Sequence, residues 1–542
     1  MKYGVVGANI SRGFSKEIYR KLINCDYDVV DVDGDGFDEF MRTRDFEGVN
    51  IIAPYNERIM KYLDEIDAHA EELGCVDTVV NKGGRLCGYN TTFGAFCALA
   101  AHSGIEMRGR KVLVVGEDAV AKTVGAACIS LGAADVCTAR SDAVKPNDSV
   151  NIIVNTEKAE IACNADLSGF EKLDGVLDIT APPLRTPLVL AAKAANIAAE
   201  GGLFMAVRQC VLSSELFTGD KIHYGVSERV YAEIMRANEN IVLIGLPGCG
   251  KSVVGELIAS IMGRKFIDID TEIEKKYGSI SYLLKEKGEE KFRDIEQKMI
   301  KAHSLETGVV IAAGGGAVIR KQNVNELKSN GKLFFIDRSP TLISTSQKDP
   351  LSSSRMALMA LFGQRYSVYR DAADVRIDAD VSVKEVADSV ISKFKRQSAV
   401  GRLKFLVISG PSVMLLGMGD GRETYSDICV KIKSHAETLG VDVDVFNSDC
   451  EGEIVSKIAS ATADVDGIII NPSSYAYTSI AICDALRAAG VLSFEVVIDD
   501  FSVGDTYKMR DYVEDVCIGK IKTKGADGYI YAIDKLSQKL SK

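Results

Sequence analysis

IVLIGLPGCGKS, residues 241–252, joins an apolar strand to a glycine-rich loop. The residues that follow, VVGELIASIMG, have the apolar spacing of a helix. The loop therefore matches the pattern GxxxxGKS in the strand–loop–helix context where phosphate-binding loops occur. Glycines at these positions let backbone N–H groups face phosphate oxygens, and the N-terminus of the helix adds a partial positive charge. We predict a P-loop nucleotide-binding unit of the α/β class around this stretch.

The same loop supplies the predicted ATP contacts. We expect Lys251 to reach the β- and γ-phosphates as a catalytic residue, and the Ser252 hydroxyl to hold Mg²⁺. A glycine turn of purely structural use is the alternative interpretation of the pattern. The predicted ATP-binding residues are Gly248, Cys249, Gly250, Lys251, Ser252 and Val253.

The composition of the 542-residue chain is that of a globular protein with about three or four domains. Apolar residues make up 46% and the net charge is −11, which argues against nucleic-acid and anionic-membrane partners. No apolar run is long enough to predict a membrane span, and we expect no secretory leader. The 13 cysteines lack CxxC spacing, as free thiols in a reducing compartment do. We therefore expect a cytoplasmic protein.

Strand-like apolar runs alternate with amphipathic helical stretches along the chain, which is typical of α/β folds with parallel sheets. We predict three consecutive α/β blocks: an N-terminal block, 1–238, a middle block, 239–397, and a C-terminal block, 403–542. The N-terminal block divides into lobes 1–105 and 106–238, because a second strand–helix series begins at KVLVVG.

Three further patterns follow the P-loop in the middle block. Asp268 and Asp270 lie in FIDID, which places two acids on one face of a predicted strand end. GEEKFRDIE contains Arg293, and the strand VVIAA leads into Gly314, Gly315 and Gly316. Behind a P-loop, these patterns closely resemble shikimate kinase, a family that carries DxD, GExxFRxxE and a GGG turn in this order. The resemblance implies a fold like that of the nucleoside-monophosphate kinases.

The resemblance also implies a role for each matching residue. Asp268 would sit in the outer shell of the metal, and Asp270 would bind shikimate hydroxyls and take the proton from the attacking one. Arg293 and Arg365 would clamp the carboxylate, because a forked guanidinium suits that group. The implied reaction moves the γ-phosphoryl group of ATP to the 3-hydroxyl of shikimate, with ATP and Mg²⁺ as cofactors. The implied substrate-binding residues are Asp270, Arg293, Gly314, Gly315, Gly316 and Arg365.

The lid segment departs from the family pattern. The family reads RPLL there, with an arginine that contacts the nucleotide phosphates, whereas this chain reads KDPL with Asp349 at the arginine's place. A carboxylate beside phosphate groups repels them. We therefore expect the altered lid to change the rate of phosphoryl transfer more than the choice of substrate. Lys348 and Arg355 are the candidate replacements if the lid shifts.

The N-terminal block resembles shikimate dehydrogenase over FSKEIY, GVNIIAPYN, GCVDTVVN, GYNTT and GGLFMAVRQ. The family uses a Lys–Asp pair to assist hydride transfer. Asn56 and Thr92 stand in place of that pair, and neither is a general acid near neutral pH. Asp77 stands in place of a substrate-binding asparagine. Several residues still match the family's substrate pocket: Ser15, Asn50, Thr78, Asn90 and Gln209.

The cofactor loop of this block is altered as well. Glu117 and Asp118 follow Gly116 where the family has GAGGA, so two negative charges stand where a pyrophosphate should lie. Arg140 occupies the place of the arginine that reads the 2′-phosphate of NADP. We expect the block to be inactive as a dehydrogenase and do not expect NADP as a cofactor.

The C-terminal block resembles type II 3-dehydroquinate dehydratase, a flavodoxin-like family, over FLVISGPSVMLLG, CEGEIVSKI, GIIINPSSYAYTSIAICDAL and FEVVIDD. The family removes a proton with a tyrosine next to an arginine and uses a histidine as general acid. Val497 stands in place of that histidine, Tyr477 in place of a substrate-binding histidine, and Met414 in place of an asparagine. Arg422 and Tyr425 lie near the shortened loop without matching it. The residues that still match are Asn471, Ser479 and Glu495.

Together the resemblances imply a fusion of shikimate-pathway enzymes for chorismate and aromatic amino-acid biosynthesis. We predict a working shikimate kinase between two degenerate blocks, with ATP and shikimate as small-molecule partners and with self-association through the C-terminal block. Two other hypotheses stay open: a multifunctional enzyme that retains dehydratase or dehydrogenase activity, and a non-catalytic sensor or scaffold. A kinase for a related polyol acid is a third.

Overall fold

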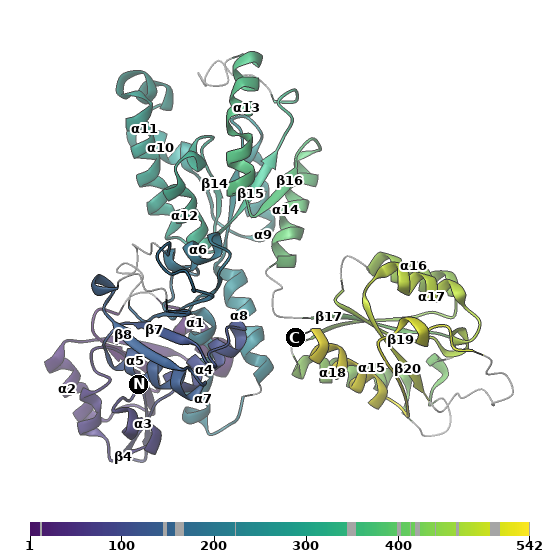
Figure 1. Ribbon diagram of the computed structural model, residues 1–542, viewed down its shortest axis with the longest axis horizontal. Coiled ribbons are helices and arrows are strands. Elements are labelled where there is room, and N and C mark those ends of the chain that lie inside the picture. Colours follow the sequence, from purple (N-terminus) through teal and green to yellow (C-terminus); the bar gives the residue numbers. More distant parts are fainter. Residues whose placement is uncertain are drawn as a thin grey trace. The chain divides into compact units, whose positions relative to one another are not determined.

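The computed structural model describes residues 1–10, 13–144, 149–157, 167–222, 224–343, 354–397, 403–411, 413–417, 423–439, 441–461, 465–498 and 510–540. These residues form two compact units, one of Met1–Ile222 with Val230–Ala399 and one of His223–Arg229 with Val400–Lys542. Among the described residues the first unit has three sheets and the second has one, all flanked by helices, so the predicted α/β class is confirmed (Figure 1). None of the described helices combines the length and apolarity that a membrane crossing needs.

The first lobe of the N-terminal block has a mixed sheet. Its strands are β1 (Tyr3–Gly7), β2 (Tyr27–Asp31), β3 (Gly48–Ile51), β4 (Glu65–Ile66), β5 (Thr78–Lys82) and β6 (Arg85–Tyr89). They lie in the order β2-β1-β3-β5-β6-β4, with β5 antiparallel to both of its neighbours. The helices are α1 (Ser15–Ile23), α2 (Gly34–Thr43), the 3-10 turn η1 (Arg58–Tyr62), α3 (Ala68–Leu73) and α4 (Thr92–Ser103).

The second lobe has a parallel sheet of Rossmann type. Its strands are β7 (Lys111–Val115), β8 (Asp135–Ala139), β9 (Ile152–Asn155), β10 (Gly175–Asp178) and β11 (Ala198–Glu200), in the order β11-β10-β9-β7-β8. The helices are α5 (Ala119–Ser130), α6 (Pro187–Ala194), α7 (Leu203–Thr218) and α8 (Tyr224–Asn238), with a 3-10 turn η2 (Ser141–Ala143). α7 packs on α4 and α1 of the first lobe, which joins the two lobes.

The middle block has one parallel sheet around a single apolar core. Its strands are β12 (Asn240–Ile244), β13 (Phe266–Asp268), β14 (Val310–Ala312), β15 (Gly331–Asp337) and β16 (Val375–Asp378), in the order β13-β14-β12-β15-β16. The helices are α9 (Lys251–Met262), α10 (Ile269–Tyr277), α11 (Ile280–Ser304), η3 (Ala317–Ile319), α12 (Lys321–Asn330), α13 (Arg355–Ala372) and α14 (Val383–Gln397).

This topology positions the middle block's predicted site. β12 is central, and the P-loop leaves its carboxyl end, while Asp268 ends β13 and the glycine turn 314–316 follows β14. Carboxyl ends of parallel strands meet at one edge of a sheet, so all three segments converge there.

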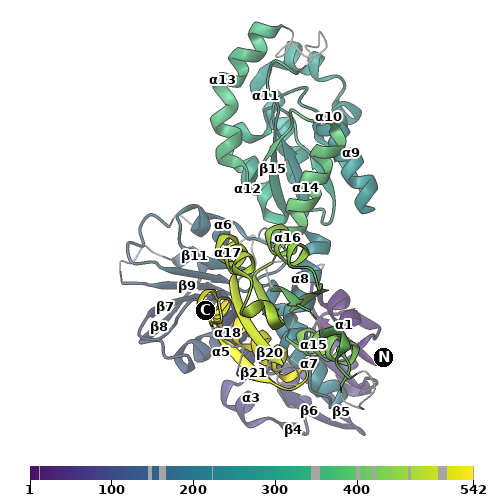
Figure 2. The ribbon, with the colours of Figure 1, turned by 90° about the vertical axis from the view of Figure 1, so that its right-hand side faces the viewer.

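The C-terminal block has another parallel sheet. Its strands are β17 (Lys404–Ser409), β18 (Asp442–Asn447), β19 (Gly467–Asn471), β20 (Leu492–Ile498) and β21 (Lys520–Thr523), in the order β18-β17-β19-β20-β21. Its helices are α15 (Tyr425–Thr438), α16 (Glu451–Ala461), α17 (Ile480–Ala489) and α18 (Asp527–Leu540), with the 3-10 turns η5 (Val413–Leu415), η6 (Ser473–Ala476) and η9 (Glu514–Val516). Alternate residues of β17 enter two cores, so α15 and α18 cover one face and α16 and α17 the other (Figure 2).

Candidate active site

The P-loop closes tightly around its own lysine. Gly245, Gly248 and Gly250 have φ angles of 149°, 74° and 100°, which favour glycine. Lys251 is 8% exposed, and its Nζ donates to the carbonyl oxygens of Gly245 at 3.0 Å and Leu246 at 2.9 Å. These bonds hold the ammonium group inside the loop, at the end of the helix where phosphates would bind.

Two of the predicted ATP-binding residues have side chains that lie in the core and at the surface, although Sγ of Cys249 still accepts from Nζ of Lys251 at 4.0 Å. The Cys249 side chain is buried in the core, and its N–H donates to the carbonyl of Leu246 at 3.2 Å. The Val253 side chain is exposed, although the residue lines the cavity described below. At these two positions a nucleotide would meet mainly backbone, as the motif requires of its variable positions.

The two residues predicted for the metal site lie together. The Ser252 hydroxyl donates to Oδ2 of Asp268 at 2.6 Å, and Oδ1 of Asp268 accepts from the N–H of Thr271 at 3.1 Å. A hydroxyl and a carboxylate are the oxygen donors that Mg²⁺ prefers, so the residues present fit this ion.

Asp268 also corrects one prediction from the sequence. Asp268 and Asp270 do not both lie on a strand: Asp268 ends β13 and caps α10, and Asp270 lies in the first turn of α10. The strand pattern failed because the Asp268 side chain starts a helix at the next residue. Both carboxyl groups still line the same cavity.

This cavity measures about 500 Å³ and is built mainly from the predicted residues. Its lining includes Lys251, Ser252, Asp268, Asp270, Arg293 and Arg365. Burial raises the pKa of Asp270 to about 6, against the opposing effect of the Lys251 charge. Asp270 is therefore a carboxylate close to its titration range at neutral pH, as a general base should be.

Two arginines, Arg293 and Arg365, also line this cavity. Arg293 donates from Nη1 to Oε2 of Glu296 at 2.8 Å and from Nη2 to Oε1 of Glu289 at 3.2 Å. Arg365 donates from Nη1 to the carbonyl of Gly315 at 3.0 Å. Each group keeps further N–H donors, because a guanidinium has five.

The turn of Gly314, Gly315 and Gly316 packs closely against the neighbouring side chains of the site. A Cβ on Gly314 would lie 2.6 Å from Oδ1 of Asp270, and one on Gly316 would lie 2.1 Å from Nη1 of Arg293. A Cβ on Gly315 would lie 2.7 Å from the Pro247 ring. The three predicted glycines therefore let the turn approach the acid, the arginine and the P-loop together.

Sequence reasoning assigned no role to three other residues near the site. Glu296 is 1% exposed and holds Arg293 in place, and burial raises its pKa. The hydroxyl of Tyr369 donates to the carbonyl of Gly315. Arg338 lies beside Gly250. Of these three roles, only that of Glu296 could have been predicted from the sequence, because Glu296 lies three residues after Arg293 and such a pair can meet on one face of a helix.

Only part of the lid region lies within the described residues. Lys348 and Asp349 lie outside the described residues. Arg355, the other candidate replacement, donates to the carbonyl of Pro340 and, at 3.0 Å, to that of Ile343.

The substituted positions of the N-terminal block are bonded to other groups of the protein. Asn56 is buried and donates from Nδ2 to the carbonyls of Ile51 at 2.8 Å and Val76 at 3.3 Å. Thr92 Oγ1 accepts from Nε2 of Gln209 at 3.2 Å. Neither arrangement brings a titratable donor into the pocket.

Asp77 and the cofactor loop are also engaged internally. The Asp77 carboxylate accepts from the N–H groups of Thr91 and Thr92 and from the hydroxyls of Thr78 and Thr91. Asp118 caps α5 by accepting from the N–H of Ala121 at 2.9 Å, so a carboxylate occupies the helix N-terminus. Arg140 is exposed and pairs with Asp142 at 3.1 Å.

At the general-acid position of the C-terminal block, Val497 has no titratable proton. Val497 is half-buried on β20, Met414 is exposed on η5, and Tyr477 follows η6. Asn471 donates to the hydroxyl of Tyr529 at 3.2 Å. Arg422 lies outside the described residues, and Tyr425 begins α15.

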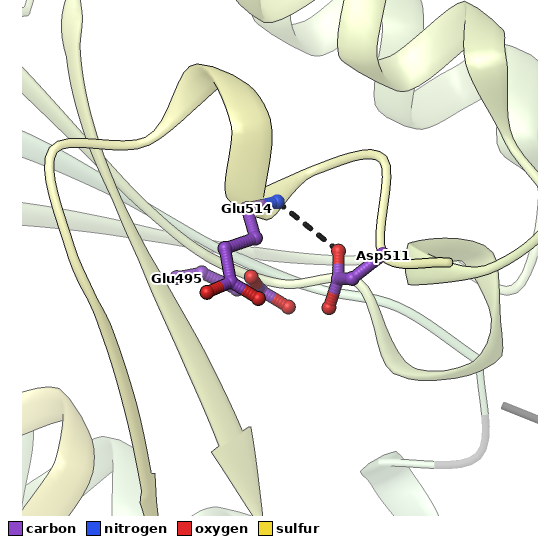
Figure 3. Close-up of side chains that lie close together, drawn as sticks. All are labelled: Glu495, Asp511 and Glu514. Atoms are coloured by element: carbon purple, nitrogen blue, oxygen red, sulfur yellow. Dashed lines mark hydrogen bonds between the residues drawn. The ribbon is translucent and has the colours of Figure 1, made fainter. Parts of the chain in front are cut away.

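Three carboxylates of this block, those of Glu495, Asp511 and Glu514, lie close together (Figure 3). The ammonium group of Lys520 lies among them, pairing with Asp511 and lying 3.1 Å from Glu514 and 3.6 Å from Glu495. Burial, followed by the Asp511 charge, raises the pKa of Glu495 to about 8. Lysine is therefore the cation of this cluster, and the cluster is no argument for a metal.

Comparisons with known proteins agree with the three predicted resemblances and their order. Residues 247–395 match the family model of shikimate kinase, residues 403–537 that of dehydroquinase class II, and residues 5–79 that of the shikimate dehydrogenase substrate binding domain. A shikimate kinase from Clostridium botulinum is 39% identical over 154 residues, which cover 28% of this chain and 93% of that protein. A 3-dehydroquinate dehydratase from Clostridium acetobutylicum is 38% identical over 144 residues, 26% of this chain and 100% of that protein. Shikimate dehydrogenase 1 from Peptoclostridium difficile, a solved structure, shares 23% identity at a TM-score of 0.40 over 43% of this chain and 98% of that one.

Proposed function

The chain belongs to the shikimate kinase family through residues 247–395 and to the class II dehydroquinase family through residues 403–537, and we propose that only its kinase site is catalytically active. The proposed reaction transfers the γ-phosphoryl group of ATP to the 3-hydroxyl of shikimate. The proposed cofactors are ATP and Mg²⁺.

The observation that carries this proposal is the composition of the 500 Å³ cavity. Its lining combines P-loop residues, among them Lys251, with Arg293 and Arg365. A polyhydroxylated acid with its carboxylate on the arginines would direct its ring hydroxyls towards Asp270. Both substrates would thus meet at the carboxylate of Asp270, whose pKa burial raises to about 6.

The chemistry then depends on positioning and charge. Asp270 accepts the proton of the attacking hydroxyl while the oxygen of that hydroxyl bonds to the γ-phosphorus. The bond between the γ-phosphorus and the oxygen of the β-phosphate breaks, and ADP is released. Lys251 exchanges its loop carbonyls for phosphate oxygens and stabilises the charge that develops there. Ser252 and Asp268 would hold Mg²⁺, which neutralises charge between the β- and γ-phosphates when bound.

The proposal that the flanking blocks are inactive rests on their substituted side chains. Asn56, Thr92 and Val497 have no proton to give near neutral pH, and the carboxylate of Asp118 repels a pyrophosphate from α5. Retained pocket residues such as Asn50 are bonded to one another: its Nδ2 donates to Thr78 at 3.0 Å and Ser213 at 2.9 Å.

Release of ADP by the full chain, with and without shikimate, tests the kinase proposal. We expect shikimate-dependent release that Lys251→Ala abolishes. Replacing shikimate by quinate, a related polyol acid, tests whether the clamp accepts other acids.

A further inference from the structure

We infer that Arg338 binds the phosphate groups of the nucleotide, a role that neither the motifs nor the family matches assign to it. The inference rests on the proposed kinase function and adds one residue to its phosphate side. Arg338 directly follows β15, which pairs with β12, the strand that leads into the P-loop. It therefore emerges at the sheet edge where the site is built.

The direction of Arg338 follows from its neighbour Asp337. Oδ2 of Asp337 accepts from Nε of Arg376 at 2.6 Å and from the hydroxyl of Tyr366 at 3.2 Å. Successive side chains at a strand end point to opposite sides, so Arg338 points away from these partners. Its Nη1 lies 3.9 Å from the position that a Cβ on Gly250 would take. The guanidinium is thus beside the residue that precedes Lys251.

Two unsatisfied features meet at this point. The Nε of Arg338 is buried, and no described residue accepts a hydrogen bond from it. Gly250 is also the N-cap of α9, and no side chain caps the first N–H groups of that helix. Buried donors normally have acceptors, and uncapped helix N-termini bind anions. One phosphate group would satisfy both.

The charges around Arg338 favour the same occupant. The Asp337 carboxylate is already paired with Arg376, so the charge of Arg338 is not cancelled by its neighbour. Arg293 and Arg365 donate to Glu296 and Gly315, and both are proposed to bind the acceptor's carboxylate. Arg355 donates to backbone carbonyls. Arg338, beside Gly250, is therefore the arginine that the phosphate groups would meet together with Lys251.

Calorimetric titration of the full chain with Mg·ATP and Mg·ADP, without shikimate, tests the inference. We expect Arg338→Ala to raise the Kd for ATP by about tenfold to a hundredfold, the usual effect of losing a hydrogen bond to a charged group. The KM for shikimate should stay within about twofold. Arg338→Lys should recover part of the affinity, because lysine keeps the charge but not the fork.

Arg370→Ala is the matched control, because Arg370 is an exposed arginine of α13 that pairs only weakly with Asp371 in the described structure. Equal ATP affinity and kcat in Arg338→Ala and Arg370→Ala, with unchanged Tm, would overturn the inference. If Arg338→Ala does not fold, Arg338→Gln keeps most of the stem, and the same comparison applies. A wild type that binds ATP but does not phosphorylate shikimate refutes the proposed function, while the titrations still decide the role of Arg338.

Discussion

Asp270 lies in the first turn of α10, where burial and the charge of Lys251 act on its carboxyl group in opposite directions. Burial prevails and raises the pKa to about 6. The ionised form accepts a proton, whereas the protonated form cannot, so activity should rise as the pH passes upward through this pKa.

We therefore expect kcat/KM for shikimate to fall below about pH 6, with one acidic limb that reports Asp270 in the free enzyme. Asp270→Asn should lower kcat by about 10²- to 10⁴-fold, because the amide cannot take the proton. Steady-state assays from acid to neutral pH measure both. An unchanged kcat in the Asn variant would remove Asp270 from the chemistry.

Single residues also show what the sequence could and could not predict. Lys251, Ser252 and Asp268 lie together because each lies at or just after the carboxyl end of a strand of one parallel sheet. The order of the motifs in the sequence predicts this placement. The roles of Tyr369 and Arg338 depend on neighbours 50 or more positions away in the sequence, such as Gly315 for Tyr369. No local sequence pattern predicts these two roles. Cys249 belongs to the motif, yet its side chain faces the core.

At the scale of elements, the turn 314–316 sets the shape of the acceptor end. Gly316 has a φ of −112°, which alanine can adopt, so a substitution there acts through space alone. Its Cβ would lie 2.1 Å from Nη1 of Arg293, and Arg293 would have to move. The position of the turn's backbone therefore determines where Arg293, one of the two arginines proposed to bind the substrate carboxylate, can lie.

Gly316→Ala should raise the KM for shikimate by about tenfold or more and leave ATP affinity unchanged, because a guanidinium–carboxylate contact is lost. Gly363→Ala on α13 is the control, since a Cβ there meets nothing within 4 Å. That control should be neutral or slightly stabilising. A Gly316→Ala enzyme with wild-type KM would show that Arg293 does not hold the acceptor.

At the scale of the whole molecule, the N-terminal block is bonded to the middle block within the first compact unit. Arg185 donates to the carbonyls of Lys328 at 3.1 Å and Gly331 at 3.2 Å, and it pairs with Glu239, which directly precedes β12. Glu239 is 4% exposed. The strand that carries the P-loop thus begins beside an ion pair whose carboxylate is buried and whose arginine is partly exposed.

Removing this pair should destabilise the first unit. We expect Arg185→Ala to lower its unfolding free energy by about 3 kcal/mol, because a buried carboxylate is left without its partner. Thermal unfolding of the full chain measures the change as a lower Tm. Arg185→Ala combined with Glu239→Gln should recover part of the loss, and no recovery would mean that the pair is not the cause.

The flanking blocks give a second prediction at this scale. The full chain should neither oxidise NADPH with 3-dehydroshikimate nor dehydrate 3-dehydroquinate, because Asn56, Thr92 and Val497 supply no acid. Absorbance assays of the purified chain measure both reactions. Turnover in either assay that survives Lys251→Ala would favour the multifunctional enzyme.

The resemblances made the fold class and the order of the blocks predictable, since each depends on motifs that stay close together in the sequence. The internal bonding of Asp77, which accepts from Thr78, Thr91 and Thr92, was not predictable, because those bonds form only after folding. It explains how a substituted pocket remains a stable part of the fold.

The most direct measurement of the central claim is ADP release by the full chain with ATP, Mg²⁺ and shikimate, against the Lys251→Ala variant. The account predicts release that depends on shikimate and disappears in the variant. Release no greater than that of the variant, from folded protein that still binds ATP, would contradict it and leave a different acceptor or a non-catalytic role.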